Sequence, residues 1–436
     1  MSNHVLEGAN ANSDACTSDP SSDGEDSVGG TASDGPTAAE ARMENTASST
    51  SPPLPSQPMD PQLLKAATSG DSESLHGMAS QHPEVLHGRT PAGNTCLHIA
   101  SAHGHQEFCK DVLALNMSLL ATVSVDIETP LVIAVKSGHA SLALVLLAHW
   151  RCRQQLTDAS AILQKDKNGC NALHHAIRGG HEKLALELIA TEAALSRDVN
   201  NKEESPMFIA AVKNLTDVIK KLLENSDSPH GGPCSQNALH AAVRKGNPDI
   251  ARLIMKTRPQ LATEENADKS SPMHQAIHDK KIDIVTVLLE HDPSLGYLLC
   301  SKSDAPPLNS AAAVGDVDIA RELLKHCPDT PYCDKSGFTC LHEAVSNGHT
   351  GFVQFVLGSK QLSPLVNMQD HQGRTALHIA AEMRNSKIIP ALLLHQGIDI
   401  TLPNNSGKTA RQVLLAATED NKETIWVCIF FPFRLF

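Results

Sequence analysis

The sequence predicts an all-α solenoid built from about ten to eleven helix-turn-helix repeats, and three observations lead to this prediction. A phrase that begins GNTCLHIASAHGH at Gly93 returns as GCNALHHAIRGGH at Gly169, GFTCLHEAVSNGH at Gly337 and GRTALHIAAEMRN at Gly373. Weaker copies lie between these four at a nearly constant spacing. Aromatic residues make up only 3% of the 436 residues, which suits helices packed through Ala and Leu better than a sandwich or a barrel.

The repeat period stays close to 34 residues along most of the chain. The Leu position of the phrase falls at Leu63, Leu97, Leu131, Leu173, Met207, Leu239, Met273, Leu308, Leu341, Leu377 and Arg411. The steps between these positions are 34, 34, 42, 34, 32, 34, 35, 33, 36 and 34 residues. One such unit cannot bury its apolar face alone, so the units are expected to stack on one another.

Each copy carries the signals of a short first helix followed by an apolar second helix. A Thr, Ser or Asn such as Thr95 can cap the helix N-terminus, and a Pro such as Pro130 suits the first helical turn. Leu97 and Ala100 are three residues apart and therefore share one helix face. Gly104 tolerates a positive φ and is expected to end the helix. Apolar second helices follow, for example DIARLIMK from Asp249 and DIARELLKH from Asp318.

A period near 33 residues with a T-P-L-H-x-A core resembles the ankyrin repeat, and the resemblance covers Met59 to about Ala417. The segments MDPQLLKAATSGD at Met59, DKNGCNALHHAIRGGH at Asp166 and DHQGRTALHIAAE at Asp370 are also similar to plant ankyrin-repeat proteins of the accelerated-cell-death-six type. The ankyrin resemblance implies short hairpin fingers that line a concave groove together with the first helices. The plant group implies a regulator of defence or cell death, held at the plasma membrane by helices that follow the repeats and carry a Pro-Gly-Gly motif.

The composition divides the chain into three parts. Residues 1–58 form an acidic Ser/Pro-rich leader, which has too few apolar side chains to offset its ordering entropy and is predicted to be disordered. Residues 59–418 form the ankyrin-repeat domain, and residues 419–436 form a short apolar tail. Ile425–Phe436 is interrupted by Pro432 and Arg434 and is shorter than the roughly 20 residues that a spanning helix needs. We interpret the tail as a truncated membrane domain, the alternative being a soluble variant.

One repeat is longer than the others and contains an aromatic and basic cluster. The long step places about eight extra residues in AHWRCRQQLTDASAILQKDKNG, between Leu131 and Leu173. The cluster consists of Trp150, Arg151 and Arg153, and Trp and Arg are enriched at interface hot spots. These three residues are therefore candidates for partner contact. The alternative is that Trp150 closes the helix core while both Arg side chains are solvated.

Turns between the repeats supply further candidates for partner contact. Segments such as CDKSG, MQDHQG and LPNNSG place Asp or Asn near Gly, which is typical of tight turns. If the resemblance to the ankyrin fold holds, these turns are the finger tips. The candidates are the finger residues that differ between repeats, namely Lys335, Phe338, His371, Arg374 and Lys408.

The 23 His residues do not indicate a metal or catalytic site. Six of them recur at one repeat position, namely His98, His174, His240, His274, His342 and His378. A residue that recurs once per unit serves the unit, so we expect hydrogen bonds that bridge adjacent turns. No carboxylate or Cys completes a metal set around His98, His103 and His105 at the usual ligand spacing. Phosphate-loop and hydrolase motifs are absent from the sequence, so we predict no metal, no cofactor and no enzymatic activity.

The net charge and the cysteine residues limit the classes of partner and the cellular compartment that we expect. The formal net charge is −13, of which the leader holds −8, and the repeats show no basic footprint for nucleic acid. Eleven scattered Cys residues without a C-x-x-C motif or a signal peptide indicate reduced thiols in the cytosol or nucleus, and we expect a cytoplasmic location. We expect a scaffold whose partners are other proteins, with no small-molecule substrate. The alternative is the cytosolic part of a multi-spanning membrane signalling or transport component, which would place a full-length form on the cytosolic face of the plasma membrane.

Overall fold

The computed structural model describes residues 57–152 and 161–417, and within these ranges it contains 21 α-helices and no β-strand. The all-α prediction is therefore confirmed. The first helices of the repeats are α1 (Pro61–Ser69), α3 (Cys96–His103), α5 (Pro130–Lys136), α7 (Ala172–Arg178), α9 (Pro206–Lys213), α11 (Ala238–Lys245), α13 (Pro272–His278), α15 (Pro307–Val314), α17 (Cys340–Ser346), α19 (Ala376–Glu382) and α21 (Ala410–Ala417). The second helices are α2 (Ser72–Gln81), α4 (Gln106–Leu115), α6 (Ala140–Cys152), α8 (Glu182–Thr191), α10 (Thr216–Leu223), α12 (Pro248–Thr257), α14 (Ile282–His291), α16 (Val317–His326), α18 (Thr350–Gly358) and α20 (Ile388–Leu393).

Short 3₁₀ helices follow most of the second helices and turn the chain toward the next repeat. They are η1 (Pro83–His87), η2 (Met117–Ala121), η4 (Ala193–Arg197), η5 (Pro233–Ser235), η6 (Pro259–Ala262), η7 (Pro293–Tyr297) and η8 (Ser363–Asn367). Several of them begin with Pro, whose fixed φ suits the first turn of a helix.

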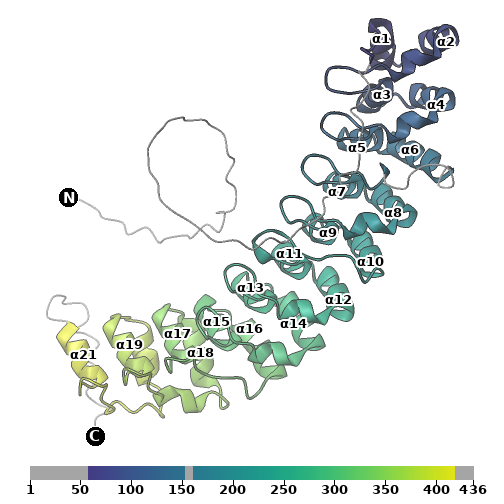
Figure 1. Ribbon diagram of the computed structural model, residues 1–436. Helices are drawn as coiled ribbons and strands as arrows, with labels where there is room; N and C mark the ends of the chain where they lie inside the picture. The colour runs from purple at the N-terminus through teal and green to yellow at the C-terminus, as the bar shows by residue number, and fades with distance from the viewer. Residues whose placement is uncertain (1–56, 153–160, 418–436) are drawn as a thin grey trace, which may run out of the picture. The chain divides into compact units, whose positions relative to one another are not determined.

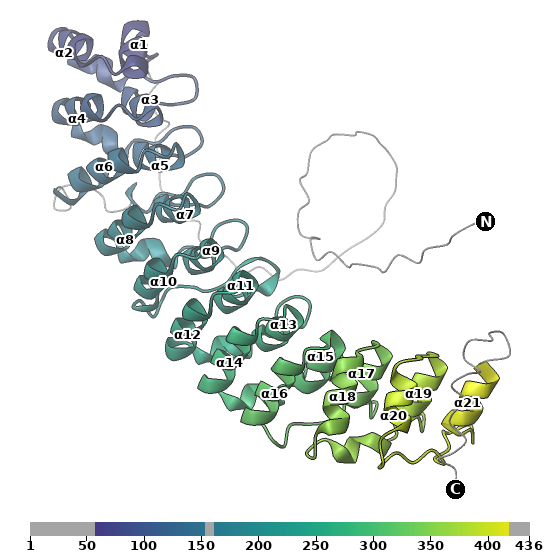
Figure 2. The same ribbon diagram turned by 180° about the vertical axis from the view of Figure 1, so that it is seen from behind.

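The helices form two parallel rows, as the two opposite views in Figures 1 and 2 show. Each odd-numbered helix from α1 to α21 packs against the next odd-numbered helix, and most even-numbered helices do the same in the second row. Loops between repeats extend past the odd-numbered row, on the side away from the even-numbered row (Figure 1). The structure therefore has the repeated helix-turn-helix architecture that the sequence predicts, with eleven first helices.

The local signals in the sequence determine where each helix begins and ends. Thr129 caps α5 by accepting a hydrogen bond from the Val132 amide at 3.3 Å, and Ser205 caps α9 by accepting one from the Phe208 amide at 3.1 Å. Prolines occupy the first turn of α5, α9, α13 and α15. Gly104 has a φ of 79° and ends α3 in the left-handed conformation, as expected.

One continuous hydrophobic core runs between the two rows. The Leu position of the phrase is buried in every repeat from Leu63 to Leu377, and the Ala three residues later is fully buried as well. Because Ala is small, neighbouring first helices approach closely at that position.

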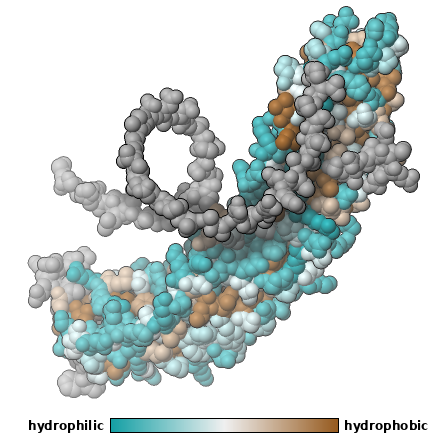
Figure 3. Space-filling view, viewed as in Figure 1, coloured by the Kyte–Doolittle hydropathy of each residue, from teal (hydrophilic) through white to brown (hydrophobic). Residues whose placement is uncertain are grey.

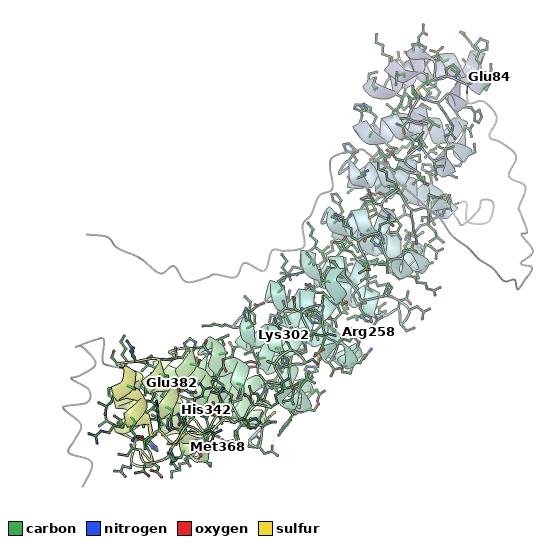
Figure 4. The ribbon with its side chains drawn as sticks, turned by 60° about the vertical axis from the view of Figure 1, so that its left-hand side comes forward. Glu84, Arg258, Lys302, His342, Met368 and Glu382 are labelled. Carbon is green, nitrogen blue, oxygen red and sulfur yellow. The ribbon has the colours of Figure 1, made fainter. Side chains whose placement is uncertain are left out.

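Arg258 is the one buried arginine among the described residues, and it donates to the carbonyl oxygens of Ser228 (2.6 Å) and Asn225 (2.8 Å) in the loop that follows α10 (Figure 4). It thereby supplies hydrogen bonds to carbonyl groups beyond the end of that helix.

The described helices lie within the expected bounds of the repeat domain, 59–418, and these bounds stay a prediction. Asp60 accepts hydrogen bonds from the amides of Gln62 and Leu63 and so begins α1 directly before Pro61. The last described helix, α21, ends at Ala417. Most of the predicted leader (1–58) and all of the predicted apolar tail (419–436) lie outside the described residues. Among the described helices, none has the length and hydrophobicity that crossing a membrane requires.

Candidate interaction surface

A loop that we call a finger leads into each first helix from α3 to α21. The ten fingers among the described residues share one backbone feature. The residue two positions before each first-helix cap has a positive φ; these residues are Gly93, Ile127, Gly169, Glu203, Ser235, Lys269, Asp304, Gly337, Gly373 and Gly407. In most fingers its amide donates to the carbonyl three residues earlier, for example from Gly169 to Asp166 at 2.9 Å. Three fingers also contain a single isolated antiparallel bridge. The fingers are thus tight turns rather than extended β-hairpins.

Neighbouring fingers are connected to one another by backbone hydrogen bonds. The amide of Val125 donates to the carbonyl of Ala92 at 2.9 Å, and the amide of Asn405 donates to that of Gln372 at 3.0 Å. Equivalent bonds run from Asn201 to Asn168 and from His371 to Ser336. These bonds restrain most of the fingers relative to a neighbour, so much of the row offers a preformed surface to a partner.

The repeated histidines support the base of the fingers. The Thr95 amide donates to Nδ1 of His98 at 3.1 Å, so the proton lies on Nε2, which donates to the carbonyl of Glu128 in the next finger at 3.1 Å. Nε2 makes the same bridge from His240 to Ser270, from His342 to Arg374 and from His378 to Lys408, each at 3.0 Å. The bridging bonds expected at six positions are therefore present at these four, whereas Nε2 of His174 and Nε2 of His274 are buried without a hydrogen-bond partner. Burial lowers the pKa of His98 and of His174 to about 4, so both rings are neutral at pH 7.

Three of the predicted finger contacts are exposed. Lys335 is exposed and pairs with Asp304 of the preceding finger at 2.9 Å. His371 is exposed beside Gly337, and Lys408 is exposed near the end of the row. Their side chains lie on the finger row, where a partner could reach them.

The other two predicted finger contacts are held by neighbouring repeat residues. The Phe338 ring is half-buried and lies against the His342 ring, with 5.2 Å between the centroids. Arg374 donates to Asp370 at 2.8 Å and to Glu382 at 3.1 Å (His342 and Glu382 are labelled in Figure 4). Both side chains contribute to the finger base and present less surface to a partner than Lys335 or Lys408.

The structure describes two of the three residues of the cluster in the long repeat, and only one of these two is exposed. Trp150 is only 6% exposed and packs into the core at the end of α6, so the prediction of Trp150 as a partner contact is wrong. The ring is large and apolar, and burial against the helices is its more favourable environment. Arg151 is exposed and pairs with Glu187 at 2.7 Å and with Thr191 at 2.7 Å on α8. Arg153 lies outside the described residues.

A buried polar cluster at the base of one finger was not identified from the sequence. Ligand-type atoms of Asp166, Cys170 and His175 lie within 4.8 Å of one another. The Cys170 amide and the His175 ring both donate to the Asp166 carboxylate at 2.9 Å, while Arg178 donates to the Cys170 sulfur at 3.5 Å. The only signal in the sequence is that Cys170 follows Asp166 by four residues and precedes His175 by five.

The hydrogen bonds of this cluster explain its charge state. Burial alone would raise the pKa of Asp166, but the bonds from the Cys170 amide and from His175 outweigh burial and lower it. Burial lowers the pKa of His175, so a neutral ring donates to an ionised carboxylate. The adjacent Arg178 guanidinium opposes a cation between these groups. We therefore treat the cluster as a polar network that fixes the finger on the helix below it.

Stacked helical pairs with a row of inter-repeat fingers define a class of repeat proteins that bind other proteins. Family models agree with this assignment: "Ankyrin repeats (3 copies)" matches residues 151–230, 227–298, 293–366 and 308–404, and "Ankyrin repeat" matches residues 92–120. The chain belongs to the ankyrin-repeat family. Ankyrin repeats indicate a protein-interaction domain.

Curated relatives cover different parts of the chain. The chain is 24% identical to the protein ACCELERATED CELL DEATH 6 of Arabidopsis thaliana over 393 residues, which are 83% of this chain and 57% of that protein. It is 30% identical to the putative E3 ubiquitin-protein ligase XBAT31 of Arabidopsis thaliana over 37% of this chain and 38% of that protein. The chain therefore spans less than two thirds of the length of these relatives. Among solved structures, the human ASB11 ankyrin repeat domain matches 53% of this chain and 98% of its own at 25% identity, with a TM-score of 0.41.

Proposed function

We propose that the chain is a protein-interaction scaffold in plant defence or cell-death signalling, which binds its partners through the fingers and the first-helix row. The observation that carries this proposal is the row of fingers, most of which are joined to a neighbour by backbone hydrogen bonds and which expose side chains that differ from repeat to repeat. The similarity to ACCELERATED CELL DEATH 6 along 83% of the chain supports the choice of pathway. The proposal includes no catalytic step, because the buried polar groups described above hold fingers and helices together.

A second candidate is the cytosolic part of a membrane signalling or transport component. It is favoured by one observation, that the similarity covers only 57% of ACCELERATED CELL DEATH 6, so this relative has a further region. In that case the repeats would lie on the cytosolic face of the plasma membrane and would act as its interaction domain. In the first candidate, the scaffold would act in the cytoplasm.

Site-specific photo-crosslinking in plant leaf tissue tests both candidates. A photoreactive amino acid is placed at Lys335 or Lys408 on the fingers, or at Lys256 on the exposed face of α12 as the matched control. We expect the finger positions to capture discrete partner proteins and the control position to capture few. Capture that is equal at Lys256, or absent from the fingers, would argue against the interaction surface. Sedimentation of the crosslinked species with membranes would favour the second candidate, and its recovery from cytosol the first.

A further inference from the structure

The finger at residues 124–128 contains a conformation that its amino-acid type disfavours. Ile127 has a φ of 61°, at the position where five of the ten fingers have Gly and four have a polar residue. A β-branched side chain in the left-handed region is a genuine outlier, because its branches crowd the backbone. Such strain is kept only where the surroundings require it, and it is often found at ligand-binding sites.

The same finger exposes aliphatic surface to solvent. Val125 is 70% exposed and Ile127 is 43% exposed, and together they form what we call the aliphatic tip. Hydrophobic side chains are visible along this edge of the N-terminal repeats in Figure 3. The corresponding tips in the next two repeats are polar, with Lys167 and Asn168 in one and Lys202 and Glu203 in the other. Core packing accounts for neither the exposure nor the strain.

A row of cations begins directly beside the aliphatic tip. Four successive first helices, α5, α7, α9 and α11, end with basic residues and contain no Asp or Glu; this cationic row consists of Lys136, Arg178, Lys213, Arg244 and Lys245. Lys136 pairs with Glu128, the residue next to Ile127, so the tip and the row adjoin. Basic residues favour helix C-termini in general, but α15, α17, α19 and α21 end without one.

The cations of this row face solvent more than their carboxylate partners do. The Lys136 side chain is 45% exposed and that of Glu128 only 12%, while Arg178 is 39% exposed and Glu204 only 23%. None of the ion pairs among the described residues involves Lys213 or Lys245, both of which are exposed. At the ends of these four first helices the exposed charges are therefore mainly positive, although the ion pairs of Lys136 and Arg178 are neutral in sum.

From this juxtaposition we propose that the aliphatic tip and the cationic row bind an acidic polypeptide segment of a partner protein, with one aliphatic side chain of that segment seated against Val125 and Ile127. The inference rests on the proposed function, since it specifies one site on the same finger surface. Apolar contact at the tip would fix the register of the segment, and charge attraction along α5–α11 would speed and orient its association. Binding would also explain why the position holds a strained Ile, because Gly has no side chain that could contact the partner.

Selection from a random peptide library displayed on phage tests the partner chemistry with the full chain as bait. We expect the enriched peptides to combine several Asp or Glu residues with one Leu, Ile or Val, and to bind less tightly as salt is raised. Enrichment of basic or neutral polar peptides would overturn the proposal. Dimers of the chain that dissociate in Ile127→Gly, measured by light scattering, would also overturn it, because a second copy would then be the occupant.

Two pairs of variants test the site with one selected peptide, by fluorescence polarisation. Ile127→Gly should weaken binding at least about tenfold, as loss of a hot-spot side chain does, while thermal stability stays equal or rises. Glu203→Gly is the matched control, since Glu203 has a φ of 62° at the same finger position. Because this change removes an exposed negative charge, it should not weaken the binding of an acidic segment. The double variant Lys213→Gln/Lys245→Gln should reduce both the affinity and its salt dependence. Unchanged affinity in Ile127→Gly would overturn the proposal, and if crosslinking on the fingers still captured partners, the proposed function would survive alone.

Discussion

At the scale of single residues, the buried histidines link folding to pH. Burial lowers the folded-state pKa of His98 and His174 to about 4 from an ordinary 6.5, and it lowers that of His240, His274 and His342 as well. Below pH 6.5 the unfolded chain therefore binds protons that the folded chain excludes. For His98 and His174 the stabilisation is complete above pH 6.5 and is lost as pH falls toward 4, by up to about 1.4 kcal/mol per pH unit for each of the two. The other three histidines contribute in the same direction.

Urea unfolding between pH 7 and pH 4.5 checks this prediction. We expect the unfolding midpoint to fall steadily below pH 6.5, before the carboxylates with lowered pKa, such as Asp166 and Asp370, begin to contribute near and below their ordinary pKa of 3.8. His98→Gln should be less stable at pH 7, because the bridge to Glu128 is altered, but its stability should depend less on pH. A pH dependence equal to that of the native chain would mean that His98 does not contribute.

The sequence predicted some of these residues and missed others for physical reasons. The six histidines could be assigned a structural role because they recur once per repeat, and a residue at a fixed repeat position is expected to stabilise the repeat itself. Trp150 could not be assigned, because the sequence does not show whether a helix end turns an aromatic ring inward or outward. The cluster of Asp166, Cys170 and His175 was also missed, since its members come together only when the finger folds onto α7.

At the scale of the elements, the fingers depend on the space between them as well as on their backbone angles. Gly373 and Gly407 have nearly the same φ, 72° and 69°. A Cβ on Gly373 would lie 2.5 Å from Oδ1 and 2.7 Å from the backbone N of Asn405, whereas a Cβ on Gly407 would meet nothing within 4 Å. Gly373→Ala should therefore destabilise the fold by the cost of the left-handed conformation, about 1–2 kcal/mol, and by an additional clash with the next finger.

Gly407→Ala is the matched variant for this comparison, because it carries the conformational cost without the clash. Urea denaturation of both variants should show the larger loss in Gly373→Ala, by about 1 kcal/mol or more. Equal losses would mean that the fingers do not restrain one another. The backbone hydrogen bond from Asn405 to Gln372 would then contribute little to the rigidity of the row.

Most helices could be predicted from the sequence because each one is determined locally. Caps such as Thr129 and Ser205, the prolines after them and the glycine at the end of α3 act within one turn of the chain. The finger at 124–128 shows where this reasoning ends. Nothing in Val-Asp-Ile-Glu indicates a positive φ, yet Ile127 adopts the left-handed conformation that the same position has in the other nine fingers. Only comparison with the other nine fingers reveals the outlier.

At the scale of the whole repeat domain, stability should be local because each repeat contacts little beyond its neighbours. Leu341 is fully buried in α17, which packs against α15, α18 and α19. Leu341→Ala should cost about 2–5 kcal/mol, the usual range for a buried leucine. In a stacked array this loss spreads mainly to adjacent units. Hydrogen exchange should therefore accelerate in α15–α19 and remain nearly unchanged in α1–α9.

Leu97→Ala is the mirror-image variant, since Leu97 occupies the same repeat position in α3 and is also fully buried. Its faster exchange should appear in α1–α5 and leave α15–α19 protected. If both variants instead loosened every repeat to the same extent, the domain would unfold as one cooperative unit. The fingers would then transmit strain along the whole row, and a partner bound at the aliphatic tip near α5 could change the stability of repeats as distant as α19.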